Sequence, residues 1–165
     1  MHEAMETHRK ELREKLATIK DERKKTIVER LSGRFEEINS AMTDRFNREA
    51  DRLEDILLKI QTRRDKAFAG GSNVAAVDTA IDKATKLLAD LRTAISDQAA
   101  KTYPISITTE EALRGAVGTV RKGLADDLQK VRTRIRDLHQ AIRDAAKALG
   151  SIPGIENDAA TSTPQ

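Results

Sequence analysis

The side chains that most often bind metals or move protons are few in this chain. It contains three histidines, His2, His8 and His139, and no cysteine. None of the histidines belongs to an HExxH pattern, which places two histidines and a glutamate on one helix face for zinc. Even a catalytic zinc site takes three protein ligands, and the sequence does not gather that many. We therefore expect surface histidines, with no metal site, no cofactor, no disulfide and no cysteine nucleophile.

Carboxylates occur as sequence neighbours, at Glu36 and Glu37, at Glu110 and Glu111, and at Asp126 and Asp127. Neighbours on a helix point about 100° apart, because one turn takes 3.6 residues, so these pairs do not make a facing acid and base. The second pair is explained by the field at a helix N-terminus, which favours negative charge. The sequence also lacks a Ser/His/Asp constellation, a phosphate-binding loop and a dinucleotide fingerprint. It therefore predicts a protein that is not an enzyme.

The chain contains clusters of basic residues, which are candidates for binding nucleic acid. The 30 basic residues are balanced by 27 acidic ones, and the aromatic residues that could stack on bases make up only 2% of the chain. In the densest cluster, alternate spacing scatters the charges around a helix, and nearby aspartates offset them. A solvated helix surface is the favoured interpretation, and binding of nucleic acid or an anionic surface is the alternative. The clusters are Arg63-Arg64-Lys66, Arg121-Lys122 and Lys130-Arg132-Arg134-Arg136.

The remaining composition predicts long helices around an aliphatic core. Charged residues make up 35% of the 165 residues and are interleaved in sign, which is typical of solvated helix faces and coiled coils. No apolar run approaches the roughly 20 residues needed to cross a bilayer, and residues 1–15 lack the apolar centre of a signal peptide. We expect a cytoplasmic location, or an extracytoplasmic one if a signal peptide was removed before Met1.

Apolar residues at helical spacing predict a very long first helix over about residues 4–68. From Ile27 to Ala67 the apolar stripe recurs every ~3.6 residues, close to a straight helix rather than a tight supercoil. No proline interrupts it. The helix ends in the sequence AFAGGS, where Gly70 or Gly71 can take the positive φ of a C-terminal cap.

Two further helices are expected, over about residues 73–101 and 109–149. Ser72 or Asn73 can cap the first of these, and Pro104 stops it, because proline disfavours helical geometry in the residue before it. The stretch between the two helices, residues 102–109, is expected to be extended.

The last helix begins with a capping box, in which the Thr108 hydroxyl and the Glu111 carboxylate each accept from an unpaired backbone N–H. Gly150 caps its other end. Three glycines in its first half suggest a close approach of another backbone; they are Gly115, Gly118 and Gly123.

The helix lengths predict how these segments pack. At about 1.5 Å per residue, the last helix is ~60 Å long and the middle one ~42 Å, and an extended crossover adds up to ~26 Å. The middle helix and the crossover together therefore span the last helix. We predict an all-α fold, an elongated antiparallel three-helix bundle of residues 27–150 with a very long first helix, followed by a flexible tail over 151–165.

Residues 1–26 are left over by this arrangement, because no other segment is long enough to cover them. An isolated helix of this length is marginal in water, so we expect a protruding arm that self-associates or docks a partner. The apolar stripe of the arm, which is the candidate interaction site, consists of Met5, Leu12, Leu16 and Ile19.

Three stretches resemble a family of uncharacterised helical, coiled-coil-like proteins of ultrasmall candidate-phylum bacteria. They are DRFNREADRLEDILLKIQTRRDKA (44–67), KTYPISITTEEALRGAVGTVRKGLADDLQKVR (101–132) and AIRDAAKALGSIPGI (141–155). The resemblance implies a charged long helix, an extended Tyr-x-Ile-x-Ile-Thr crossover and an Ile-Pro-Gly end. It brings no known activity, and it implies an extracytoplasmic location, because such proteins often carry export signals. The sequence thus predicts a non-enzymatic structural or protein-interaction module.

Overall fold

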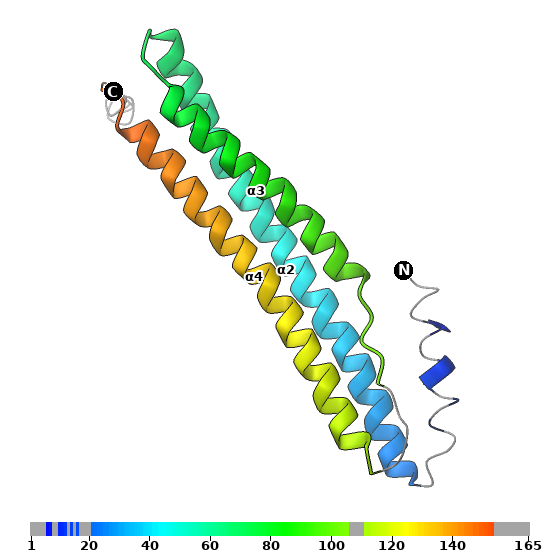
Figure 1. The fold of residues 1–165 in the computed structure, drawn as a ribbon. Coiled ribbons are helices and arrows are strands. Elements are labelled where there is room, and N and C mark those ends of the chain that lie inside the picture. The colour runs from blue at the N-terminus through cyan, green and yellow to red at the C-terminus, as the bar shows by residue number, and fades with distance from the viewer. Residues whose placement is uncertain are drawn as a thin grey trace, which may run out of the picture. The chain divides into compact units, whose positions relative to one another are not determined.

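The computed structural model describes residues 6, 7, 10–12, 14, 16, 21–105 and 111–153. Within these ranges the chain is all-helical, with no strand. Three long helices make up most of it: α2 (Glu22–Ala69), α3 (Ala75–Ala100) and α4 (Leu113–Gly150). Figure 1 shows each of them as an unbroken helix. No helix in the described part of the chain is both long enough and apolar enough to cross a membrane.

Helix α2 begins later than the sequence predicts, because Asp21 caps it. The Oδ1 atom of Asp21 accepts from the backbone N–H of Arg23 at 2.9 Å and from that of Lys24 at 3.4 Å, and Asp21 itself is not helical. These bonds satisfy N–H groups that have no partner within the helix. The helix predicted to run unbroken over residues 4–68 is therefore interrupted at Asp21. Before this break, the described residues 6, 7, 10–12, 14 and 16 are helical.

The turn between α2 and α3 follows the sequence prediction. Gly71 takes a φ of 83°, and the N–H of Ser72 donates to the carbonyl of Ala67 at 3.0 Å. Asn73 then caps α3, because its Oδ1 accepts from the N–H of Ala75 at 3.1 Å. Glycine is favoured at position 71 because a Cβ would be strained at the positive φ of this residue.

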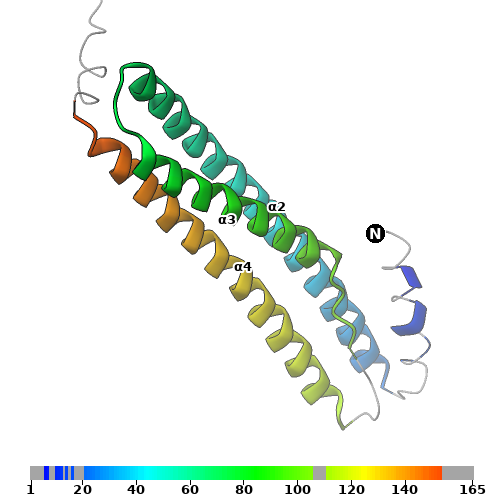
Figure 2. The same cartoon turned by 45° about the horizontal axis from the view of Figure 1, so that its top comes forward.

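Helix α3 ends at Ala100, one residue before the predicted limit, and residues 102–105 are not helical, as expected. Figure 2 shows the chain leaving α3 in an extended trace. The rest of the predicted crossover, including Thr108 of the proposed capping box, lies outside the described residues. Helix α4 begins at Leu113 instead of residue 109, after a turn at Glu111 and Ala112.

The last helix and the segment after it differ from the prediction in two ways. A Cβ added at Gly115, Gly118 or Gly123 would meet no atom within 4 Å, so no backbone approaches these glycines closely. Ile152 is 8% exposed, so the second residue of the predicted tail over 151–165 is packed against the rest of the chain. Residues after 153 lie outside the described part.

The helices form two compact units. Unit 1 consists of Met1–Arg45 and Ala94–Val131, and unit 2 consists of Phe46–Thr93 and Arg132–Gln165. In unit 2 the core is apolar, mostly aliphatic, and follows the predicted apolar spacing closely. It includes Phe46, Ala50, Leu53, Leu57 and Ile60 of α2, Val77, Ile81, Ala84, Leu88 and Leu91 of α3, and Leu138, Ile142, Ala145 and Leu149 of α4.

Ion pairs in unit 2 show which helices are neighbours and how they run. Arg64 of α2 pairs with Asp78 of α3, and Arg92 of α3 pairs with Asp51 and Glu54 of α2. Residue numbers rise along one helix as they fall along the other, so α2 and α3 are antiparallel within this unit. On another side of α2, Glu49 Oε1 lies 2.9 Å from Nε2 of His139 in α4.

The core of unit 1 departs from the predicted stripe. Helix α2 buries Val28, Ser32, Asn39 and Thr43 where the apolar spacing predicts Ile27, Leu31, Ile38 and Met42. Ile27 is 48% exposed, and the other three are half-buried. At these four positions the buried residue follows the predicted one, whereas Phe35 is buried as predicted. Three of the four buried residues are polar, and Asn39 and Thr43 have hydrogen-bond partners there. The Thr43 hydroxyl, for example, bonds to the carbonyls of Asn39 and Ser40.

Candidate functional site: a polar network in unit 1

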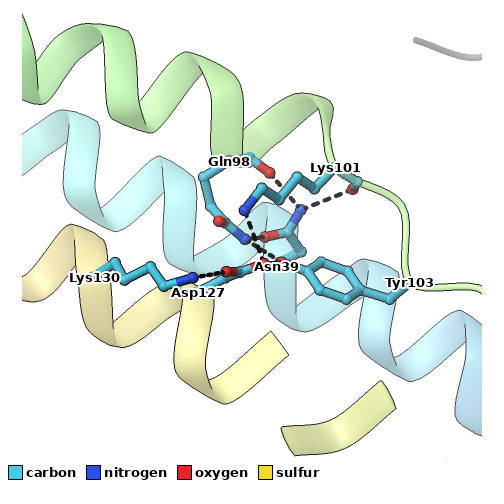
Figure 3. Close-up of polar contacts among 6 residues, drawn as sticks. All are labelled: Asn39, Gln98, Lys101, Tyr103, Asp127 and Lys130. Atoms are coloured by element: carbon cyan, nitrogen blue, oxygen red, sulfur yellow. Dashed lines mark hydrogen bonds and ion pairs between the residues drawn. The ribbon is translucent and has the colours of Figure 1, made fainter. Parts of the chain in front are cut away.

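A network of polar side chains joins three helices of unit 1 at the end of α3 (Figure 3). Its amide pair comes from Asn39 of α2, which is 5% exposed, and Gln98 of α3, which is 2% exposed. The Nε2 of Gln98 donates to Oδ1 of Asn39 at 2.8 Å. We call this cluster the polar network; its members are Asn39, Gln98, Lys101, Tyr103, Asp127 and Lys130.

Asn39 also determines how α3 ends. The Nδ2 of Asn39 donates to the backbone carbonyl of Gln98 at 2.9 Å and to that of Lys101 at 3.3 Å. Carbonyls in the last turn of a helix have no hydrogen-bond partner within the helix. A buried carbonyl therefore needs a partner from another part of the protein. A side chain of α2 therefore supplies the C-terminal cap of α3.

Tyr103 connects the amide pair to α4. Its hydroxyl accepts a hydrogen bond from Nε2 of Gln98 at 2.6 Å and donates to Oδ2 of Asp127 at 3.2 Å. Pro104 favours an extended backbone at Tyr103, and the next residue, Ile105, is 2% exposed. Burial raises the pKa of the Tyr103 phenol, so the group stays neutral and keeps its proton for Asp127.

Asp127 of α4 carries the negative charge of the network. Lys101 Nζ lies 2.8 Å from its Oδ2, and Lys130 Nζ lies 2.8 Å from its Oδ1. Hydrogen bonds from Lys101 and then Lys130 lower the pKa of Asp127 to about 2. In return, Asp127 raises the pKa of Lys130. The carboxylate is thus ionised at neutral pH and is a weak base.

The chemistry of these groups favours holding helices together. Amides do not titrate, the phenol is neutral, and the carboxylate has two ammonium partners. Within the described residues, no buried side-chain nitrogen or oxygen lacks a hydrogen-bond partner. A general acid or base needs a pKa near the working pH, whereas the pKa values of Tyr103, Asp127 and Lys130 are all shifted away from neutrality. The network therefore joins α2, the end of α3 and α4 through hydrogen bonds and ion pairs.

The predicted interaction stripe has a different environment from the one expected. Leu12 is 5% exposed and Leu16 is 2% exposed, so the chain itself covers both side chains. The expectation that these two leucines are uncovered is therefore wrong. Met5 and Ile19 lie outside the described residues.

The histidines do not form a metal site in the described part of the chain. His139 pairs with Glu49, and His2 and His8 lie outside the described residues. Among the described residues, no three potential metal ligands are grouped. Asp126 and Asp127 diverge as expected: the first pairs with Lys122 at the surface, and the second belongs to the polar network.

Sequence reasoning missed the polar network, although a weak signal for it exists. Asn39 follows Phe35 by four residues, and Gln98 follows Ile95 by three, so both lie in phase with buried apolar residues. A polar residue in phase with a core stripe is a candidate for a buried hydrogen bond. Comparison of the chain with protein-family models, with curated proteins and with solved structures finds no match in any of the three.

Proposed function

We propose that this protein is a non-enzymatic structural or protein-interaction module, built as an elongated antiparallel three-helix bundle with an extended crossover between α3 and α4. The polar network is the observation that carries this proposal. Its six side chains bond to one another and to backbone carbonyls, and they join α2, α3, the following connection and α4. Polar groups used in this way hold helices together, which is the requirement for a rigid scaffold.

We further propose that the module self-associates or docks a partner through residues 1–26. The burial of Leu12 and Leu16 limits how this can happen. A second copy, or a partner, has to replace the cover that these leucines have within the single chain. Exchange of a terminal segment between identical chains is a common route to a dimer, and the helix break at Asp21 provides a place where the chain can change direction.

Light scattering over a range of protein concentrations tests this interface. The full chain is expected to form a dimer, and Leu12→Lys with Leu16→Lys is expected to return it to a monomer. The matched control is Glu11→Lys with Glu14→Lys, which changes neighbouring exposed positions to the same residue. A full chain that stays monomeric at every concentration rejects self-association through residues 1–26, and a dimer that survives the leucine changes places the interface elsewhere.

A second candidate function is electrostatic binding of nucleic acid or an anionic surface. The observation that favours it is the set of exposed basic side chains on α2 and α4 in unit 2, most of which make no ion pair within the described residues. The low net charge of +3 does not reveal this set, because acidic residues elsewhere offset it. Salt dependence tests the function, since binding through phosphates weakens steeply as salt is added.

A further inference from the structure

The charges of unit 2 are separated between the two flanks of α2. One flank faces α4, as the contact between Glu49 and His139 shows. The other faces α3, where Asp51 and Glu54 meet Arg92. With 3.6 residues per turn, each exposed residue of α2 can be assigned to one of these flanks.

The flank of α2 towards α4 is strongly basic. Five exposed basic residues fall within about 100° of one another on this side of the helix. The acid among them, Glu49, already pairs with His139 and lies 3.7 Å from Arg52, and Asp55 borders the outer edge. The five residues are Arg48, Arg52, Lys59, Arg63 and Lys66.

The adjoining flank of α4 is basic as well. Arg132, Arg136, Arg143 and Lys147 recur at spacings of 4, 7 and 4 residues, which keeps them on one side of the helix next to His139. All four are exposed, and none makes an ion pair in the described part of the chain. Aspartates lie on the next strip of the helix, at Asp137 and Asp144. We call the two flanks together the basic face.

The side of unit 2 where α2 meets α3 has the opposite character. Asp51 and Glu54 there are matched by Arg92, and Asp65 and Asp78 are matched by Arg64. Two arginines therefore compensate four carboxylates between α2 and α3, whereas most cations of the basic face have no acidic partner in the described part of the chain. The alternate spacing of arginines on α4 does not scatter them evenly, because Arg132 and Arg136 fall on the basic face while Arg134 points away from it.

We infer that the basic face of unit 2 binds the phosphate backbone of duplex DNA without reading its sequence. The row on α2 runs from Arg48 to Lys66, about 27 Å at 1.5 Å per residue. Phosphates of one strand of duplex DNA recur every ~3.4 Å along the axis, so this length spans about eight base pairs. Helices that pack together lie about 8–10 Å apart, so the second row offers a parallel track of positive charge.

Other anionic occupants fit the basic face less well. Proteins that hold single strands combine basic grooves with aromatic residues for base stacking, and the basic face includes no aromatic residue. Helices that lie on membranes bury a broad apolar face rich in Trp, Phe or Leu, whereas Ile56, at 44% exposed, is the large apolar residue among these cations. Duplex DNA needs neither feature, because unpaired cations at regular spacing are sufficient for its backbone.

This inference deepens the second candidate function, and matched charge-removal variants of the full chain test it. Lys59→Gln with Lys66→Gln removes two charges from the basic face. Lys83→Gln with Lys86→Gln removes two exposed lysines from α3, which lie off that face, and gives the same net charge. Binding is measured by fluorescence anisotropy of a labelled 20-base-pair duplex between about 50 and 200 mM salt. Circular dichroism checks that the variants keep their helices.

The wild-type chain is expected to bind the duplex with an affinity that falls steeply with salt. The basic-face variant is expected to bind at least about tenfold more weakly at low salt, with a salt slope reduced by about two, because two phosphate contacts are lost. The α3 variant is expected to change neither quantity by more than about twofold. Arg132→Gln with Arg136→Gln, on the other row, is expected to behave like the basic-face variant.

The remaining outcomes overturn the inference in distinguishable ways. Equal weakening by both lysine pairs means that overall charge, and not the basic face, controls binding, and the second candidate function then stands without this site. Tighter binding to vesicles of anionic phospholipid than to the duplex rejects DNA as the occupant but retains the same function class. A wild-type chain that binds neither duplex nor vesicles rejects both the inference and the second candidate function.

Discussion

Asn39 and Gln98, 59 residues apart in sequence, are joined by a side-chain hydrogen bond of 2.8 Å, and Asn39 returns one of 2.9 Å to the backbone of Gln98. Both residues are almost fully buried. A buried amide is costly when it has no partner and nearly neutral when it has one. The net contribution of the pair to stability is therefore small, but removing one of the two amides is costly, because the other is left buried with fewer hydrogen bonds.

Asn39→Leu is expected to lower the free energy of unfolding by about 1–3 kcal/mol, because the side chain of Gln98 and the carbonyls of Gln98 and Lys101 each lose a hydrogen bond. Urea denaturation measures the change. Ser40→Ala, at the neighbouring exposed position, is the control and is expected to change stability by less than about 0.5 kcal/mol. Equal effects of the two substitutions would show that the amide pair is not important for stability.

Replacing both amides separates the cost of an unpaired group from the strength of the pair. Asn39→Leu with Gln98→Leu is expected to destabilise by less than the sum of the two single changes, because no amide is then left unpaired. Unfolding free energies of the wild type, the two single variants and the double variant complete the cycle. Strictly additive values would contradict the direct contact between Asn39 and Gln98.

Asp127 is expected to make stability depend on acid pH. Its pKa is lowered from 3.8 to about 2 in the folded state, so its contribution is fully present above about pH 4 and is lost as the pH falls towards 2. Asp127→Asn is expected to cost of order 1 kcal/mol at neutral pH, after allowance for partial solvent exposure. In urea unfolding at several pH values, the difference between wild type and variant should shrink below pH 4. Asp126→Asn, which removes a surface pair with Lys122, is the control.

Substitution by alanine is expected to lower the stability of the protein at one glycine and to raise it at another. Gly71→Ala is expected to destabilise by about 1 kcal/mol, because Gly71 has a φ of 83°, where a Cβ is strained. Gly118→Ala is expected to stabilise by up to about 1 kcal/mol, because Gly118 is inside α4 and its Cβ would meet no neighbour within 4 Å. Thermal melts of the two variants measure both effects. A stabilising Gly71→Ala would show that the turn between α2 and α3 does not need the positive φ.

Asp21 is expected to stabilise the start of α2. Asp21→Ala removes the acceptor for two backbone N–H groups and is expected to cost about 1 kcal/mol, whereas Asp21→Asn retains a capping oxygen and is expected to cost less. Comparison of the two variants by urea unfolding separates the cap from the charge. Equal losses in both would assign the effect to the negative charge near the helix N-terminus.

Much of unit 2 could be predicted from the sequence, because one physical signal controls it. From Phe46 to Ile60 the apolar spacing on α2 coincides with the buried residues, and the glycine and asparagine of the following turn act as predicted. Hydrophobic burial is not directional, so the period of apolar residues is sufficient to identify the buried face.

Unit 1 was less predictable, because polar contacts between distant segments control it. Apolar spacing identified Ile27 as a core residue, whereas the structure buries Val28 and, three turns later, Asn39. Asn39 is stable there because Gln98 and the carbonyl of Lys101 are its hydrogen-bond partners. The sequence around Asn39 does not indicate these partners, which lie about 60 residues away along the chain. The sequence likewise predicted that Leu12 and Leu16 are uncovered, because its apolar spacing predicts one unbroken helix, whereas the helix is interrupted at Asp21.

The amide pair has a consequence for the alignment of α2 with α3 in unit 1. Two helices that meet only through aliphatic side chains can slide by one turn, because one leucine replaces another with little penalty. A slide of one turn here would bring Ile95 or Thr102 opposite Asn39, and neither position offers an amide in place of that of Gln98. A single register is therefore selected by two uncharged side chains, and this selection does not vary with pH or salt.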